Sequence, residues 1–352
     1  MNFLENLDPA IRYSLAFMLP LIGAMTLTPA VARLAHRYDV LDHPGGHKVH
    51  SQATPYLGGI AVGGGLILVG VMAAGTNGEL LTILGGGFVL GIVGLRDDLR
   101  SVSPWWRLGF EAAAGLALWF VGVRAGVFDL AFTDLPLTVL WVAVVVNAFN
   151  FIDNMDGVAA GVAACSAVGI AAVAGHNDDF LVTSFALAAA GAAAGFLRYN
   201  FPPAQIFLGD AGSMLLGFLI AALTLKLDLP VGEAAPRALT TVLLAAVPLF
   251  DLSLVMVART LGRRPLMTGG TDHTTHRLRQ RGFSGRTVLL LLIAVQTLCS
   301  GFAFWMYQQS SVTVIAAGGL LGVVWLLMLA CLLRMPTPER TRDVDAQIMV
   351  AS

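Results

Sequence analysis

The sequence predicts an all-α integral membrane protein that crosses the bilayer about eleven times as one unit. Of the 352 residues, 57% are hydrophobic and only 12% are charged, whereas a soluble domain carries roughly 25% charged residues. The mean hydropathy of +0.77 indicates the same class, and 39 glycines suit closely packed membrane helices. The net charge of −1 offers no basic face for a polyanion. Together these values exclude a soluble enzyme, a disordered chain and a nucleic-acid binder.

Eleven segments are apolar enough to span a membrane, since a bilayer core of roughly 30 Å requires about 20 apolar residues per helix. The third, sixth and seventh are rich in Gly and Ala, which makes their ends the least sharply defined. The first is too long for a signal peptide and follows an acidic flank. In chain order the predicted spans are 14–34, 57–75, 79–95, 106–124, 135–151, 157–174, 179–197, 211–227, 238–258, 287–307 and 312–333.

The distribution of Lys and Arg predicts the orientation of these spans. With the N-terminus outside, 17 of the 21 basic residues fall in cytoplasmic segments, as the positive-inside rule requires. We therefore expect an odd number of spans and a cytoplasmic C-terminus. Residues 1–335 are predicted to form one polytopic domain with cytoplasmic loops, and residues 336–352 a polar tail. The three cysteines, Cys165, Cys299 and Cys331, lie in apolar runs and are expected to be small core residues.

The loops assigned to the cytoplasmic side concentrate polar residues of specific kinds. They contain a basic first loop at about 35–56, an Asp pair directly after the third span, the run NAFNFIDNMDG, the turn FLGDAGS, and a long loop at about 259–286 that reads GGTDHTTHRLRQRG. Because the orientation rests on Lys and Arg alone, this coincidence is an independent signal. It predicts a functional site at the cytoplasmic face.

Each acidic motif has a structural and a functional interpretation. Asp97 and Asp98 could be a solvated helix end, but adjacent like charges also favour a cation or a metal-bound phosphate. Asp210, in the turn that opens a helix, could be an N-cap or could serve phosphate recognition. Asp251 and Glu111 lie inside apolar runs, and Asp251 is expected to have a packing or helix-end role near the inner face.

The asparagine run and the histidines also have alternative interpretations. Asn147, Asn150, Asp153 and Asp156 follow at steps of three, which keeps side chains near one face of a helix. Such residues either pack between helices or line a cavity. The histidine loop is either solvated or serves phosphate recognition and proton transfer. Oxygen ligands dominate and no cysteine is near, which favours Mg²⁺ or Mn²⁺ over zinc.

The combination of acids for a hard cation, a basic loop and a membrane location indicates phosphoryl transfer at the bilayer surface. One reactant would be a soluble nucleotide or sugar phosphate. The other would be a lipid phosphate, because a soluble acceptor would not need eleven helices.

Five motifs, in order, resemble the polyprenyl-phosphate N-acetylhexosamine-1-phosphate transferases, which include phospho-MurNAc-pentapeptide translocase. They are KVHxxxTPxxGG, GLRDDLxSVSPWWRLxxE, NAFNFIDNMDGVAAG, FLGDAGS and DHTTHRL, and the resemblance covers about residues 30–285. It implies ten or eleven helices in a bacterial inner membrane, a Mg²⁺ cofactor, and transfer of a sugar 1-phosphate from a UDP-sugar to undecaprenyl or decaprenyl phosphate. The products would be UMP and a lipid-linked sugar, the first such intermediate of a cell-envelope polysaccharide. A homodimer is left open.

The resemblance also implies roles for individual residues. Asp97 would be the base for the lipid phosphate, Asp98 would shape the same anionic site, and Asp210 would be the main metal ligand with Asp156 beside it. Catalytic or substrate-binding roles toward the metal, the nucleotide, the diphosphate and the sugar would fall to Asp153, Asp156, Asn147, Asn150, Lys48, His50, His273, His276 and Arg277.

Two departures from the family pattern bear on the sugar. Thr275 stands where the GlcNAc-transferase branch commonly has histidine, and Ala211 stands where the translocase branch commonly has threonine. The second argues against the translocase. GlcNAc is therefore the expected sugar, with a modified N-acetylhexosamine or UDP-MurNAc-pentapeptide as alternatives.

Direct attack by the lipid phosphate is the expected mechanism, and a covalent aspartyl intermediate is the alternative. Outside this class, a nucleotide-sugar or lipid transporter would place its polar residues near mid-membrane, often on paired halves. A non-catalytic scaffold would need no cluster of acids. The surface position of the motifs disfavours both.

Overall fold

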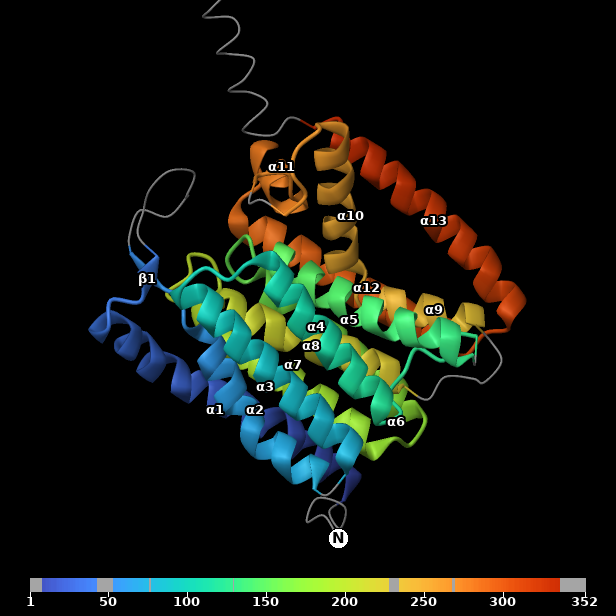
Figure 1. Cartoon of the computed structure of the whole chain (residues 1–352), viewed down its shortest axis with the longest axis horizontal. Helices are drawn as coiled ribbons and strands as arrows, with labels where there is room; N and C mark the ends of the chain where they lie inside the picture. The colour runs from blue at the N-terminus through green and yellow to red at the C-terminus, as the bar shows by residue number, and fades with distance from the viewer. Residues whose placement is uncertain are drawn as a thin grey trace, which may run out of the picture.

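The chain folds into a bundle of helices (Figure 1), described by a computed structural model for residues 8–42, 53–75, 77–128, 130–227, 234–267 and 270–335. This confirms the all-α prediction, and a single helix covers most of each predicted span except 238–258. The elements are α1 (Pro9–Arg37), β1 (Leu41–Asp42), β2 (Thr54–Pro55), α2 (Gly58–Ala74), α3 (Gly78–Leu99), α4 (Pro104–Phe120), α5 (Ala131–Ile152), α6 (Val158–His176), α7 (Phe180–Asn200), α8 (Gly209–Lys226), α9 (Ala234–Leu243), α10 (Ala246–Leu261), α11 (Thr274–Gln280), α12 (Gly285–Tyr307) and α13 (Ser311–Leu333).

Within the described residues, eight helices are long and apolar enough to cross a membrane, and the bent pair α9 and α10 adds a ninth if it counts as one span. Helices α2 and α4 have 17 residues each. The predicted number of eleven crossings and the orientation therefore stay predictions. The polar tail at 336–352 lies outside the described residues.

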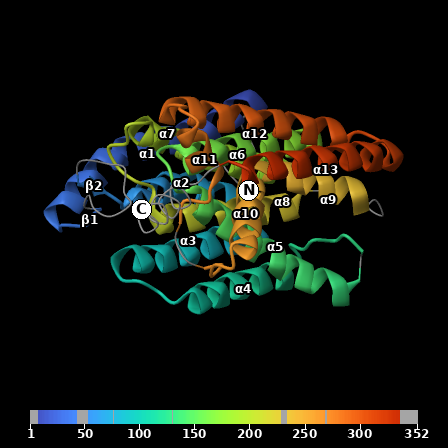
Figure 2. The same cartoon turned by 90° about the horizontal axis from the view of Figure 1, so that it is seen from above.

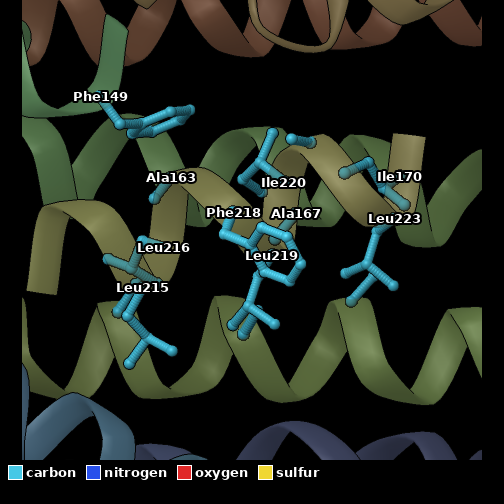
Figure 3. Close-up of a cluster of buried hydrophobic side chains, with 14 of the residues drawn as sticks. Phe149, Ala163, Ala167, Ile170, Leu215, Leu216, Phe218, Leu219, Ile220 and Leu223 are labelled. Atoms are coloured by element: carbon cyan, nitrogen blue, oxygen red, sulfur yellow. The ribbon is translucent and has the colours of Figure 1, made fainter. Parts of the chain in front are cut away.

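Helix α8 forms the centre of the bundle. It is apolar on all sides, and every residue from Ala211 to Leu225 is buried, as expected for a helix surrounded by others. Phe149 of α5 and Ala163, Ala167 and Ile170 of α6 pack around it (Figure 3). Figure 2 shows α4 on one side of α8 and α12 on the other. Helix α13 lies at the periphery, and only 6% of its 18-residue apolar stretch is buried inside the bundle.

The antiparallel contact between α3 and α8 positions the polar end of the bundle. At one end, Lys226 at the C-terminus of α8 pairs with Glu79 at the start of α3, at 2.9 Å. At the other end, a side chain at Gly94 would place its Cβ 2.2 Å from the carbonyl oxygen of Asp210. The absence of a side chain at Gly94 lets the start of α8 approach the end of α3, which brings their aspartates together.

The prediction of one helix across 238–258 is wrong, because α9 and α10 are bent by 83° at a break between them (Figure 1). Pro248 lies in the first turn of α10, where its ring would clash with the carbonyl of Leu244 in a continuous helix. The break leaves backbone groups without helical hydrogen-bond partners, and the side chain of Gln296 from α12 binds three of them. It accepts the N–H of Val247 at 3.0 Å and donates to the carbonyls of Leu243 and Leu244 at 3.1 and 3.3 Å.

Candidate active site

The N-terminus of α8 is capped by an aspartate from another helix. Asp98, at the end of α3, accepts the backbone N–H of Asp210 at 2.9 Å and that of Ala211 at 3.1 Å. Gly209 has φ +73°, and a Cβ there would lie 2.7 Å from both Asp98 Oδ2 and the carbonyl of Tyr56. The interpretation of Asp210 as an N-cap is therefore wrong. Asp98 is the cap, and the Asp210 side chain is left for other partners.

Arg107, on the first turn of α4, joins three of the predicted site residues. Its Nη1 donates to Asp97 Oδ2 at 2.8 Å and to Asp210 Oδ2 at 3.1 Å, and its Nη2 donates to Asn150 Oδ1 at 2.7 Å. Asp97 Oδ1 accepts the N–H of Val102 at 2.6 Å, so hydrogen bonds occupy both oxygens of Asp97. Arg107 was not among the residues predicted for the site. Its signal was its position one helical turn after the Ser103-Pro104 start of the helix that follows the Asp pair.

Two asparagines of α5 extend this network along one helix face, as their spacing predicted. Asn150 Nδ2 donates to Asp210 Oδ1 at 2.7 Å and to Ser213 Oγ at 3.1 Å. One turn earlier, Asn147 donates to Glu111 Oε2 at 2.5 Å and to the carbonyl of Ala143. Glu111 is fully buried, and its Oε1 has no hydrogen-bond partner among the described residues.

Asp153 and Asp156 do not continue the face of α5, because the helix ends at Ile152 and a turn closed by Gly157 at φ +78° follows. Asp156 Oδ2 accepts the N–H of Ala204 at 2.9 Å. Asp153 makes no hydrogen bond or ion pair with a residue that the structure describes. Burial raises the pKa of Asp153 well above its usual range, and the carboxylates of Asp210, Asp98 and Asp156 raise it further. Carboxylates that lie this close to one another favour a cation between them.

The histidine loop contains the short helix α11, which was not among the predicted helices. His273 Nδ1 lies 2.7 Å from Asp251 Oδ2, and Asp251 Oδ1 accepts the N–H of Thr274 at 2.7 Å. Asp251 thus has the helix-end role that was expected, and it also binds a predicted site histidine. Thr275 donates to Asn154, which ties α11 to the turn after α5.

Arg277 of α11 connects the histidine loop to the end of α13. Its side chain is buried and donates to the carbonyls of Asp272, Leu332 and Met335, which link the histidine loop to the end of α13. The other buried cation of this loop is Arg259, whose Nε lies 3.4 Å from Asp272 Oδ2. Lys48 and His50 lie outside the described residues, so their predicted roles stay predictions.

Two cavities meet at the turn after α5. The larger, about 1700 Å³, is bordered by β1, β2, the starts of α8 and α12, and α11. Its lining includes Asp42, Thr54, Asp98, Asp153, Asp156, Asn200, Phe207, Asp210, His276, Arg279 and Arg286. The smaller, about 330 Å³, lies between α4, α5 and α10, and its lining includes Arg107, Asn147, Asn150, Phe151, Asn154, Arg259 and His273. Within the described residues the predicted motifs therefore do converge. Five aspartates, including Asp98, Asp153, Asp156 and Asp210, line the larger cavity, and Arg107 and Arg259 line the smaller one.

The residues of the larger cavity suit a hard divalent cation that a ligand helps to bind. Within the described parts of the chain, no three His, Cys, Asp or Glu side chains are close enough to enclose a metal by themselves. Mg²⁺, however, usually takes only one or two carboxylates and completes its shell with water and substrate phosphates. Asp153 has no hydrogen-bond partner among the described residues. Asp210 and Asp156 line the same cavity as Asp153. This donor set fits Mg²⁺ or Mn²⁺ carried with a diphosphate.

Comparison with known proteins agrees with this chemistry. The model of glycosyl transferase family 4 matches residues 80–228. A probable undecaprenyl-phosphate N-acetylglucosaminyl 1-phosphate transferase of Bacillus subtilis is 32% identical over 307 residues, which cover 84% of this chain and 83% of the relative. A decaprenyl-phosphate N-acetylglucosaminephosphotransferase of Mycobacterium tuberculosis is 32% identical over 75% of each chain. A phospho-N-acetylmuramoyl-pentapeptide-transferase of Caldanaerobacter subterraneus is 29% identical over 61% of this chain and 74% of the relative.

Proposed function

Because the chain belongs to glycosyl transferase family 4, we propose that it transfers N-acetylglucosamine 1-phosphate from UDP-N-acetylglucosamine to a polyprenyl phosphate and releases UMP. The observation that carries this proposal is the convergence of Asp98, Asp153, Asp156 and Asp210 on one cavity, with the guanidinium groups of Arg107 and Arg259 on the next. Two anionic substrates could meet between them, one accompanied by a cation and the other held by arginines. Relatives named for GlcNAc support that sugar over the pentapeptide substrate.

In this proposal the larger cavity holds the nucleotide sugar. Asp210, Asp153 and Asp156 would hold Mg²⁺, which when bound neutralises the charge of the diphosphate and of the departing UMP. Asp98 fixes the start of α8 and therefore the position of Asp210. His276 and the arginines of α11 and α12 border the same cavity and would contact the diphosphate and the sugar.

The reaction itself is a direct displacement. An oxygen of the lipid phosphate bonds to the β-phosphorus of the UDP-sugar while the bond from that phosphorus to the bridging oxygen breaks. The bridging oxygen leaves with UMP. Asp97 is less suited to form a covalent intermediate, because it lines neither of the two cavities and Val102 and Arg107 bind its oxygens. Its carboxylate would instead hold Arg107 toward the acceptor phosphate.

We further propose that the site faces the cytoplasm of a bacterial inner membrane, as the Lys and Arg distribution indicates. In a variant without the native cysteines, a cysteine at Ser284 should react only with reagents that enter the cell, and one at Asn177 should react from outside. Labelling of position 284 from outside intact cells would contradict this orientation.

The activity is tested with purified protein, UDP-GlcNAc and undecaprenyl phosphate in detergent. We expect UMP release that requires both the lipid and Mg²⁺, and little or none from UDP-MurNAc-pentapeptide. UDP-GalNAc tests a different N-acetylhexosamine. Uptake of UDP-sugar into proteoliposomes without UMP release would instead indicate a transporter.

Asp210→Asn should lower turnover by about 10²-fold or more, as expected for loss of one key electrostatic group. The matched control is Asp134→Asn, a buried aspartate at the start of α5 that accepts the backbone N–H groups of Val127 and Phe128. Mg²⁺ should also raise the melting temperature of the wild type in the presence of UMP, and this shift should be lost in Asp153→Asn. Near-normal turnover of Asp210→Asn at saturating Mg²⁺ would remove Asp210 from the site.

A further inference from the structure

The imidazole of His273 is held by a buried carboxylate behind it. Asp251 is 0% exposed and His273 is 5% exposed, and the distance from Oδ2 to Nδ1 is 2.7 Å. The other oxygen of Asp251 accepts the N–H of Thr274 at 2.7 Å. The rings of Phe151 and His276 contact the imidazole edge-on, at 6.0 and 5.9 Å between centroids. The ring is thus fixed by a hydrogen bond on one side and by packing around it.

This arrangement selects one tautomer. An ionised carboxylate can only accept hydrogen bonds, so the proton must lie on Nδ1. Nε2 then carries a lone pair, and it makes no hydrogen bond with a residue that the structure describes. Since Asp251 occupies the buried side of the ring, the accessible part of the imidazole faces the smaller cavity that His273 lines.

The charges around His273 indicate what this lone pair meets. Arg107 from α4 and Arg259 from α10 line the same cavity, while α5 contributes the uncharged Asn150, Phe151 and Asn154. The ionisable groups packed behind His273 are Asp251 from α10 and His276 from α11, and Asp272 lies beyond Arg259. Two guanidinium groups around a cavity of about 330 Å³ suit a phosphate. A phosphate monoester has its second pKa near 6, so at neutral pH a fraction still carries a proton.

We propose that Asp251 is a positioning residue that fixes His273 with its Nε2 lone pair toward the smaller cavity, where Nε2 accepts the proton of the acceptor phosphate monoester. The proton moves from the phosphate oxygen to Nε2, and that oxygen then forms the new bond to phosphorus. Asp251 stabilises the resulting imidazolium, which later returns the proton to UMP or to water. The proton step rests on the proposed function, whereas the tautomer does not.

Asp251→Asn separates this role from a structural one. The amide oxygen can still accept the N–H of Thr274, so the start of α11 keeps its hydrogen bond. The amide NH₂ then faces Nδ1 and forces the proton to Nε2, which removes the lone pair from the cavity. The corresponding carboxylate-to-amide change in a Ser-His-Asp site keeps the geometry but leaves the histidine in the wrong tautomer. Asp134→Asn is the matched control, since Asp134 is equally buried but binds no histidine.

The first measurement is the tautomer, read by NMR of protein labelled with ¹⁵N-histidine. The chain has seven histidines, and His273→Gln identifies the signal of His273. We expect protonated Nδ1 and bare Nε2 in the wild type and the reverse in Asp251→Asn. A wild-type ring protonated at Nε2 alone would overturn the proposal. This measurement holds even if UDP-GlcNAc is not the substrate.

The second measurement is steady-state UMP release. Because about half of a phosphate monoester still carries its second proton at pH 6, Asp251→Asn should lower kcat about twofold at pH 6 and by less as the pH rises. KM for UDP-GlcNAc should change less than about threefold, and UMP binding should be retained by calorimetry. The double variant Asp251→Asn with His273→Gln should be no slower than His273→Gln alone, because both act through one imidazole. Unchanged kcat in Asp251→Asn, or additive losses in the double variant, would overturn the proposal. If the wild type releases no UMP from any UDP-sugar, the proposed function fails and the tautomer result decides the role of Asp251.

Discussion

The carboxylate of Asp98 accepts the backbone N–H of Asp210 at 2.9 Å, although the two residues are 112 positions apart in the chain. The side chain of one predicted site residue therefore determines where the other lies. An acidic group at a helix N-terminus also interacts favourably with the helix dipole. Asp98 links the end of α3 to the start of α8, and the position of Asp210 depends on this link.

Asp98→Ala should accordingly cost both stability and activity. Loss of a helix cap costs roughly 0.5–2 kcal/mol of unfolding free energy, and displacement of Asp210 by about 1 Å should slow turnover by about 10²-fold. Asp179→Ala is the control, because Asp179 caps α7 through the N–H of Val182. It should cost similar stability and leave turnover unchanged. Equal turnover in the two variants would show that the cap does not position Asp210.

Arg107 should not be replaceable by lysine. Its planar guanidinium reaches Asp97, Asp210 and Asn150 at once, whereas a lysine is a single point charge. Arg107→Lys should therefore raise KM for the polyprenyl phosphate and lower kcat, with a loss in kcat/KM of roughly 10²-fold. Arg100→Lys, at an exposed position in the same segment, keeps the wild-type values if the effect is specific. Wild-type kinetics in Arg107→Lys would exclude the bridging role.

The apolar runs and the positions of the motifs could be predicted from the sequence, because both are local properties. Burial in a bilayer requires long apolar helices, and the polar loops between them are visible as interruptions. Their meeting at one end also followed, since alternate loops of antiparallel helices lie on the same side. In the structure Asp98, Asp153, Asp156, Asp210 and His276 line one cavity.

What the sequence could not supply are the pairings between distant segments. Nothing local shows that Asp98 caps α8, that Arg107 reaches Asp210, or that Asp251 lies behind His273. These contacts depend on how the helices pack. The predicted span 135–151 ends within one residue of Ile152. The placement of Asp153 and Asp156 on the helix face of Asn147 and Asn150 was wrong, because a spacing of three fits a helix and a turn equally well over one step.

The pH dependence of two variants should distinguish the candidate proton acceptors. The acceptor phosphate loses its second proton near pH 6, so the need for a base is greatest at low pH and vanishes at high pH. If His273 is the base, the deficit of His273→Gln should shrink between about pH 6 and 9.5. The deficit of Asp97→Asn should stay constant, because Asp97 is engaged by Arg107 and Val102. Recovery of Asp97→Asn at high pH would restore Asp97 as the base.

Gln296 should be essential for stability although it lies outside both cavities. It is fully buried and binds the N–H of Val247 and the carbonyls of Leu243 and Leu244 at the break between α9 and α10. Gln296→Leu keeps the side-chain bulk but leaves these groups unpaired, at about 1–3 kcal/mol for each buried group and more in an apolar membrane interior. The melting temperature of the purified protein, followed by tryptophan fluorescence, should therefore fall by several degrees or more.

Gln308→Leu is the control for this effect, because Gln308 is exposed at the end of the same helix and its side chain donates to the carbonyl of Phe304. It should leave the melting temperature almost unchanged. Because α10 carries Asp251 and Arg259, we also expect Gln296→Leu to slow turnover more than its fraction of unfolded protein explains. If both glutamine variants have the same melting temperature, the backbone N–H and carbonyl groups at the break must have other hydrogen-bond partners. In that case α9 and α10 would not need α12 to hold their angle.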